Sequence, residues 1–461
     1  MAREHRDRGV GGSLRVACYL AIAFLLSRTT TISASDRVMQ GPLVDYVRKE
    51  DKVFAWTKKG QGKIGDTSYT ELILTSQKWR DIVWKHQLFI IKPSSVPADA
   101  RQAMLFVAGG SWRPELEDAS TPTKLPREAP IFATIAEQLK SPIAVLLHVP
   151  QQPIFDGKQE DAIIAYTFEE FMRTKDPEWP LLLPMVKSAV RAMDAVEQVC
   201  KAEWNLGIES FTVTGGSKRG WTTWLTGAVD PRATAIAPMV IDMLNMAPQM
   251  KLQRESFGKP SEMIDDYTKR GLDKVMDTPS GQALRDIVDP FSYRKHLTQP
   301  KLVILGTNDP YWPLDAANLY WDELVGSKYL LYCPNNGHGV NDLPRLAGGL
   351  AAIHQHAVTG KPLPKLTWEF SNGNGRARIH VASDVKPEKV STWTAVAASK
   401  DFRNAKWESK PATEEAGKYV CEVQVPANGY TAVFGEAVYA GEPLPYFFST
   451  NVRIISANAT P

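Results

Sequence analysis

The sequence lacks the residues and motifs that would tie its function to disulfides or metals. It has four cysteines in 461 residues. Because Cys18 lies in the amino-terminal segment, at most one disulfide can form among the other three, which excludes a cysteine-stapled scaffold. The spacings H-E-x-x-H and C-x-x-C, typical of zinc sites, are absent. We therefore expect a protein that works without a metal ion or a cofactor.

An excess of charge of one sign is also lacking. The formal net charge is +3. Residues 1–34 account for all of it, because they hold five arginines and two acidic residues. The remainder of the chain is formally neutral, so binding to nucleic acid has no electrostatic basis.

The apolar run near the amino terminus is too short for a comfortable transmembrane helix. It extends from Val16 to Leu26, follows several arginines, and precedes small polar residues up to Ser35. This is the layout of a secretory signal peptide. We expect residues 1–34 to be removed and the protein to be secreted or periplasmic, with no stable membrane insertion afterwards. An uncleaved amino-terminal anchor is the alternative.

One segment, Phe211–Trp221, carries the strongest functional signal. Its β-type run stops at two glycines, presents Ser217, and passes into an apolar helical pattern. At such a strand-to-helix turn the serine hydroxyl stands clear of the sheet, and the next amide, that of Lys218, can point at a developing oxyanion. The segment departs from G-x-S-x-G, because the second glycine is Gly220. The pattern still predicts a nucleophile elbow.

Two later strands deliver the partners that a serine nucleophile needs. A serine hydroxyl requires a base within hydrogen-bond reach and a third group that orients this base. Asp309 follows the strand that starts at Leu302, and His338 follows the strand that starts at Tyr329. Serine, aspartate and histidine in this order are typical of an α/β-hydrolase. Asp242, at the end of the preceding strand, is the competing acid and could instead bind substrate.

Further residues are candidates for the substrate and oxyanion sites. The strand that starts at Ala103 ends in glycines, and the amides of Gly110 and Ser111 could complete an oxyanion hole. Aromatic residues also crowd these loops. Most of them are expected in the core, but three could form an apolar or sugar-stacking subsite. These three are Trp112, Trp221 and Trp312.

The remaining pattern predicts the fold. Continuous apolar runs at 103–112 and 143–150 indicate strands buried on both faces, as in a parallel sheet. We predict an α/β-hydrolase domain over residues 35–362, with a mostly parallel central sheet and a helical cap inserted at about 243–300. Short alternating strands after a proline-containing linker predict an all-β, sandwich-like domain over residues 363–461.

The motifs around Ser217 and Asp309 resemble those of the PhoPQ-activated pathogenicity-related protein family. The likeness rests on Gly-Gly-Ser-Lys-Arg-Gly-Trp-Thr-Thr-Trp, on Gly-Thr-Asn-Asp-Pro-Tyr-Trp and on the loop that contains Asp242. It extends from about Pro42 into the carboxyl-terminal β domain. The resemblance implies an α/β-hydrolase fold and a triad of Ser217, Asp309 and His338.

The sequence therefore predicts a secreted serine hydrolase, an esterase or a peptidase, that forms an acyl-enzyme. Its substrate would be a small molecule, a glycan ester or a peptide. The rival hypothesis is a secreted signalling or carbohydrate-binding protein that keeps the hydrolase scaffold without turnover. Retention of serine, aspartate and histidine in order favours the enzyme.

Overall fold

The computed structural model describes residues 39–118, 120–373, 375–415 and 417–457. Residues 39–457 belong to one compact unit. The expected signal peptide over residues 1–34 lies outside the described residues. In the described part of the chain, no helix is both long and apolar enough to cross a membrane.

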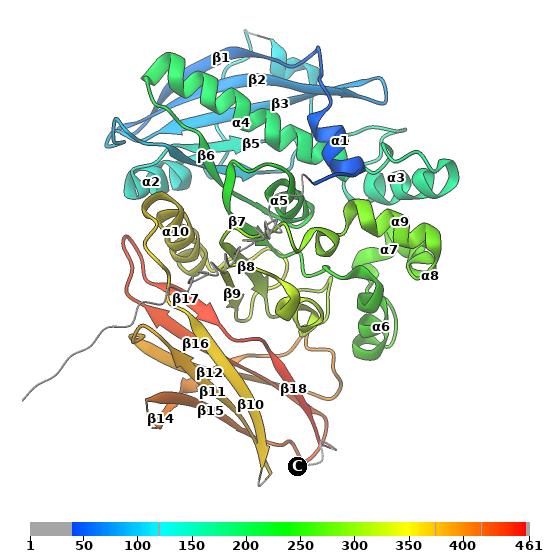
Figure 1. Cartoon of the computed structure of the whole chain (residues 1–461), viewed down its shortest axis with the longest axis vertical. Coiled ribbons are helices and arrows are strands. Elements are labelled where there is room, and N and C mark those ends of the chain that lie inside the picture. Colours follow the sequence, from blue (N-terminus) through cyan, green and yellow to red (C-terminus); the bar gives the residue numbers. More distant parts are fainter. Residues whose placement is uncertain (1–38, 119, 374, 416, 458–461) are drawn as a thin grey trace, which may run out of the picture. The chain divides into compact units, whose positions relative to one another are not determined.

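A nine-stranded sheet forms the centre of the larger, amino-terminal part (Figure 1). In spatial order its strands are β1 (Ala55–Ile64), β2 (Thr67–Trp79), β3 (Ile82–Lys92), β5 (Ile143–Leu146), β4 (Gln102–Val107), β6 (Ser210–Gly216), β7 (Ala233–Met239), β8 (Lys301–Gly306) and β9 (Lys328–Cys333). The first three strands and the β3–β5 pair are antiparallel, whereas all pairs from β5 to β9 are parallel. The predicted mostly parallel sheet is confirmed.

Helices cover both faces of this sheet, because its buried strands are apolar on both sides. One face carries α1 (Pro42–Arg48), α4 (Leu182–Trp204) and α5 (Lys218–Val229), and the other carries α2 (Ala129–Leu139) and α10 (Leu343–Thr359). The longest of these helices, α4, buries one apolar face against the sheet, as its amphipathic sequence requires.

The chain between β7 and β8 is helical, as the sequence predicts for the cap. It contains α6 (Met246–Phe257), α7 (Asp265–Thr268), α8 (Leu272–Val275) and α9 (Pro279–Val288). A further helix, α3 (Asp161–Thr174), contacts α7, α8 and α9. These helices therefore form one layer beside the carboxyl end of β6.

Three predicted strands end earlier than the sequence suggested. The apolar runs at 103–112 and 143–150, and the strand that was expected to end at Asp242, end as strands at Val107, Leu146 and Met239. His148 and Val240 have positive φ values of 63° and 46°, which break the extended conformation. The residues after each break form loops at the edge of the sheet where the candidate side chains gather.

The carboxyl-terminal part consists of two antiparallel sheets, as predicted for an all-β, sandwich-like arrangement. One contains β10 (Leu366–Gly373), β11 (Arg376–Ser383), β15 (Lys418–Gln424) and β14 (Thr413–Glu415), and the other contains β13 (Glu408–Pro411), β12 (Lys389–Ala397), β16 (Tyr430–Tyr439), β17 (Tyr446–Ser449) and β18 (Arg453–Ser456).

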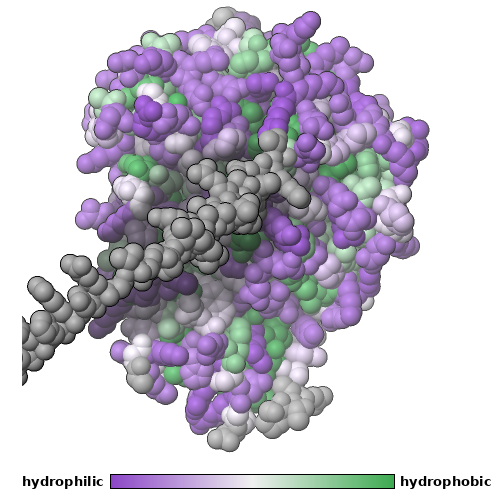
Figure 2. Space-filling view, viewed as in Figure 1, coloured by the Kyte–Doolittle hydropathy of each residue, from purple (hydrophilic) through white to green (hydrophobic). Residues whose placement is uncertain are grey.

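Hydrophilic residues cover most of the molecular face in Figure 2, as expected for a surface that meets water.

A buried ion pair joins the second of these sheets to α10. The Arg345 guanidinium donates hydrogen bonds to both carboxylate oxygens of Glu436, at 2.8 to 3.0 Å. The side chain of Glu436 is 3% exposed and that of Arg345 is 13% exposed. Trp393 Nε1 also donates to Glu436, at 3.1 Å.

We predict that Glu436→Gln lowers the free energy of unfolding by about 2 kcal/mol, because it removes one of the two carboxylates that pair with the mostly buried Arg345 guanidinium, the other being Asp342 at 2.7 Å. The matched control is Glu422→Gln, which breaks a more exposed pair with Arg376 and Arg378 and should change stability by less than about 1 kcal/mol. Urea unfolding of both variants measures the difference. Equal losses of unfolding free energy in the two variants would show that the buried Arg345–Glu436 pair contributes no more to stability than the exposed pair.

Candidate active site

Ser217 occupies a sharp turn between β6 and α5. Its φ and ψ are 58° and −128°, a conformation that is unfavourable for a residue with a side chain. The Ser217 amide donates a hydrogen bond to the Met239 carbonyl, at 2.9 Å. A Cβ atom at Gly220 would lie 2.7 Å from that same oxygen, and one at Gly215 would lie 2.9 Å from the Arg219 carbonyl. Gly220 is therefore needed for the turn to pack against β7, and Gly215 is needed for the close approach of α5 to the end of β6.

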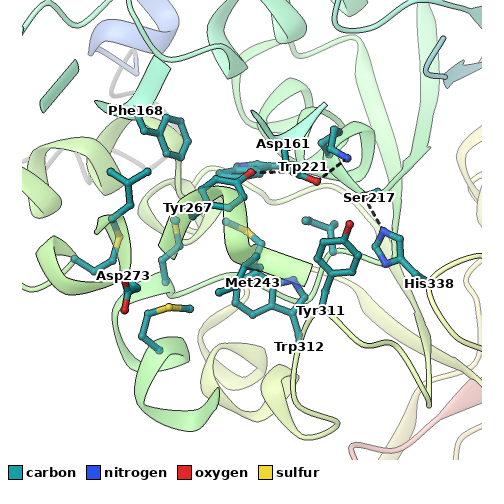
Figure 3. Close-up of a pocket in the computed structure, with 17 residues that line it drawn as sticks. Asp161, Phe168, Ser217, Trp221, Met243, Tyr267, Asp273, Tyr311, Trp312 and His338 are labelled. Atoms are coloured by element: carbon teal, nitrogen blue, oxygen red, sulfur yellow. Dashed lines mark hydrogen bonds and ion pairs between the residues drawn. The ribbon is translucent and has the colours of Figure 1, made fainter. Parts of the chain in front are cut away.

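A chain of hydrogen bonds connects the three side chains that the sequence singled out. Ser217 Oγ lies 2.8 Å from His338 Nε2 (Figure 3), and His338 Nδ1 lies 2.8 Å from Asp309 Oδ2. The second carboxylate oxygen of Asp309 accepts from the Tyr311 amide, at 2.9 Å. The Tyr311 ring also stacks on the imidazole, with 4.2 Å between centroids. These contacts orient the carboxylate and the imidazole toward Ser217.

Asp242, the competing acid in the sequence, has a different partner. Its Oδ1 accepts a hydrogen bond from the Tyr320 hydroxyl, at 2.7 Å. Burial raises the pKa of Asp242 to about 8, in spite of this hydrogen bond. A carboxyl group with this pKa is mostly protonated at neutral pH. The structure therefore places Asp309, and not Asp242, against the imidazole.

The loops that carry the acid and the base are fastened to the carboxyl-terminal part of the chain. Asn308, next to Asp309, donates through its amide to three backbone carbonyls between residues 402 and 405, at 2.7 to 3.3 Å. Asn335, in the loop of His338, exchanges two hydrogen bonds with the backbone of Trp407, at 2.8 and 3.0 Å. The sequence does not predict these hydrogen bonds, because the residues that they join lie over 70 positions apart.

A network of partly buried charges fastens the start of α5, and no motif in the sequence indicated it. Arg219 donates to both carboxylate oxygens of Glu160, at 2.6 and 2.7 Å, and to the carbonyl of Val149. Lys218 Nζ lies 2.9 Å from Glu160 and 3.1 Å from Asp161. Burial alone would raise the pKa of Glu160, but Arg219 and Lys218 lower it to about 2.

The available signal for this network was the pairing of two adjacent basic residues with two adjacent acidic residues. Glu160–Asp161 and Lys218–Arg219 are separated by more than 50 positions. Charged residues are usually exposed, so a sequence pattern gives no reason to bury them. Only the packing of α3 beside the elbow brings the two pairs together.

The candidate oxyanion amides lie in two places. Lys218 is the first residue of α5, so its amide has no acceptor within the helix. Gly110, with φ at 123°, and Ser111 are exposed in the loop after β4, and neither lines the pocket beside Ser217. A Cβ at Gly109 would lie 2.5 Å from the Arg219 guanidinium. This loop and the elbow are therefore in close contact.

The candidate aromatic residues also separate into two groups. Trp221 and Trp312 line the pocket that contains Ser217 and His338 (Figure 3). Trp112 does not line it, because its ring packs edge-on against His148 with 5.7 Å between centroids. Burial lowers the pKa of His148 to about 4. Trp112 therefore packs on His148 outside the pocket, and this position does not support a role in binding substrate.

The described residues also bear on metal binding. Within the described ranges, no cluster of three or more histidine, cysteine, aspartate or glutamate residues is arranged to bind a metal ion. Cys200, Cys333 and Cys421 are buried and unbridged. The hydrogen bonds that link Ser217, His338 and Asp309 can support the activation of a serine hydroxyl by an imidazole that a carboxylate orients.

Comparison with known proteins identifies the family. The model of the PhoPQ-activated pathogenicity-related protein family matches residues 43–403. Autocrine proliferation repressor protein A of Dictyostelium discoideum is 32% identical, and the alignment covers 91% of this chain and 89% of that protein. The chain belongs to the PhoPQ-activated pathogenicity-related protein family, as its motifs predicted.

Solved structures show weaker similarity. Acetyl xylan esterase 1 from Thermoanaerobacterium sp. JW/SL YS485 is 12% identical, with a TM-score of 0.45 over 68% of this chain and 91% of that chain. Acetyl xylan esterase from Paenibacillus sp. R4 is 14% identical, with a TM-score of 0.42 over 64% of this chain and 86% of that chain. Because the identities are below 15% and the TM-scores are below 0.5, these similarities give no information about the substrate of this chain.

The raised pKa of Asp242 predicts a pH-dependent stability. The folded protein binds this proton more tightly than the unfolded chain, so the free energy of unfolding should fall as the pH rises from about 4 to about 8, by at most about 1.4 kcal/mol per pH unit. Asp242→Asn removes this dependence. Its melting temperature should therefore exceed that of the wild type by a margin that grows from pH 5 to pH 8.

Thermal unfolding at several pH values measures this margin. Asp99→Asn, at an exposed position, is the control and should show a constant difference from the wild type. A constant difference for Asp242→Asn as well would show that Asp242 is ionised in the folded protein.

Proposed function

We propose that this member of the PhoPQ-activated pathogenicity-related protein family is a secreted serine hydrolase, an esterase or a peptidase. The observation that carries the proposal is the pair of 2.8 Å hydrogen bonds that links Ser217 to His338 and His338 to Asp309. Ser217 also lines a pocket whose walls include His338, Trp221 and Trp312, where an apolar part of a substrate could lie.

In the proposed mechanism, His338 Nε2 accepts the hydroxyl proton while Ser217 Oγ attacks the carbonyl carbon of the substrate. Asp309 stabilises the imidazolium that forms and keeps its Nδ1–H directed at the carboxylate. His338 then gives the proton to the leaving oxygen or nitrogen as the tetrahedral intermediate collapses. A water molecule releases the acyl group by the same steps in reverse order.

The oxyanion of the tetrahedral intermediate requires hydrogen-bond donors. The amide of Lys218 is the first, because it stands at the start of α5 without an intrahelical acceptor. The amide of Gly110 or Ser111 is proposed as the second. Their loop contacts the elbow through Gly109 and Arg219, which supports this choice.

A second candidate function is a secreted signalling protein that has lost turnover. The specific observation in its favour is the name of the relative from Dictyostelium discoideum, an autocrine proliferation repressor. The geometry around Ser217 argues for the enzyme, because a signalling surface requires no aligned histidine and aspartate behind a serine. Both candidates share the export signal that we propose for residues 1–34.

A fluorophosphonate probe distinguishes the two functions, because it reacts covalently with an activated serine. We expect labelling of the wild-type protein and a loss of at least about a hundredfold in Ser217→Ala. Ser95→Ala, at an exposed surface position, is the control and should label like the wild type. Absence of labelling in the intact, folded wild-type protein would refute the hydrolase proposal.

The acid can be assigned by kinetics on a p-nitrophenyl ester. Asp309→Asn should lower kcat/KM by about 10³- to 10⁴-fold, because the imidazole loses its orientation and its counter-charge. Asp242→Asn should lower it by less than about tenfold, since Asp242 bonds to Tyr320. The reverse result would assign the acid to Asp242.

A further inference from the structure

The pocket beside Ser217 has walls of one chemical kind. Seventeen residues line it (Figure 3), and all but five of them are apolar or aromatic. Four methionines contribute to these walls: Met243, Met246, Met250 and Met276. Flexible thioether side chains adapt to irregular apolar groups. The group that fills the pocket is therefore apolar along most of its length.

The charged residues close to Ser217 neutralise one another. Lys218 Nζ contacts the carboxylates of Glu160 and Asp161, at 2.9 and 3.1 Å. The other oxygen of Asp161 accepts a hydrogen bond from the Tyr267 hydroxyl, at 3.0 Å. None of these groups needs a ligand to complete its hydrogen bonds.

Asp273 differs from these residues. Figure 3 shows it on the far side of the pocket from Ser217 and His338. Its side chain is 8% exposed, and its Oδ1 is buried without a hydrogen-bond partner. The nearest cation, Arg254, lies 3.9 Å from Oδ2 and is half exposed. That distance is too long for a hydrogen bond.

A buried carboxylate oxygen without a donor is unfavourable, because it has lost water and gained nothing in exchange. A ligand that brings a positively charged N–H group to this end of the pocket would remove the penalty. The same carboxylate would repel a ligand that carries a free carboxylate at this end. The pocket therefore discriminates by charge as well as by apolarity.

We propose that the pocket binds substrates whose apolar chain or aromatic body ends in a protonated amine, with Asp273 as the partner of the ammonium group. This inference rests on the proposed function and specifies its substrate class. The ester or amide carbonyl lies at Ser217, the apolar body contacts the methionines, and the amine lies at Asp273.

A binding experiment on the full chain tests this without turnover. The probes are 3-phenylpropylammonium, 3-phenylpropan-1-ol and 3-phenylpropanoate, which have similar shapes and differ in charge. Calorimetry should show the ammonium compound binding at least about tenfold more tightly than the alcohol, and the carboxylate binding most weakly. Equal affinities for the ammonium compound and the alcohol would overturn the proposal.

Two variants and a control assign the effect to the carboxylate. Asp273→Asn should reduce the ammonium-to-alcohol affinity ratio by about tenfold. Arg254→Ala removes the competing cation and should raise that ratio roughly two- to fivefold, which provides a test if Asp273→Asn does not fold. Asp277→Asn, at an exposed position near the end of α8, should leave the ratio unchanged. An unchanged ratio in folded Asp273→Asn would overturn the proposal.

Turnover separates this inference from the proposed function. The p-nitrophenyl esters of 6-aminohexanoate and heptanoate compare an amine with a methyl group at the same position. A preference for the amino ester that falls in Asp273→Asn supports both proposals. Hydrolysis of the two esters at equal rates keeps the hydrolase function and overturns the amine inference. Ammonium-selective binding without hydrolysis of either ester refutes the hydrolase function alone.

Discussion

The conformation of Ser217 is the constraint on which the rest of the site depends. A positive φ in a residue with a side chain costs of the order of 1–3 kcal/mol and persists only when its surroundings impose it. Here the Met239 carbonyl of β7 leaves no room for a Cβ at Gly220, the carbonyls of Val107 and Arg219 leave none at Gly215, and the Met239 carbonyl also holds the Ser217 amide. The hydroxyl is thereby presented at the edge of the sheet where the loops after β8 and β9 arrive.

These loops are held by a part of the chain that the sequence analysis treated as a separate domain. Asn308 and Asn335 bond to the backbone between residues 402 and 407, so the acid and the base share one support. The family match likewise runs through residue 403, beyond the boundary expected at 362. The carboxyl-terminal sheets thus help to shape the candidate site, in addition to packing on α10.

The charges around the elbow explain how a basic pair can follow the serine without making the pocket basic. Glu160 and Asp161 neutralise Lys218 and Arg219, and this pairing ties α3 to the start of α5. The pocket that remains is apolar, with the unpartnered oxygen of Asp273 at its far side. Its ligand preference therefore depends on one carboxylate that lies outside every motif around Ser217.

The order of Ser217, Asp309 and His338 and the apolar strand patterns were sufficient to predict the α/β-hydrolase fold, because strand burial and local turns follow from nearby residues. The motifs around Ser217 and Asp309 were also sufficient to predict the family. The sequence could not choose between Asp309 and Asp242, place Trp112 away from the pocket, or reveal the Glu160 network, the Asn308 and Asn335 anchors and Asp273. Each of these depends on contacts between distant segments, whose geometry and burial only the packed tertiary structure decides.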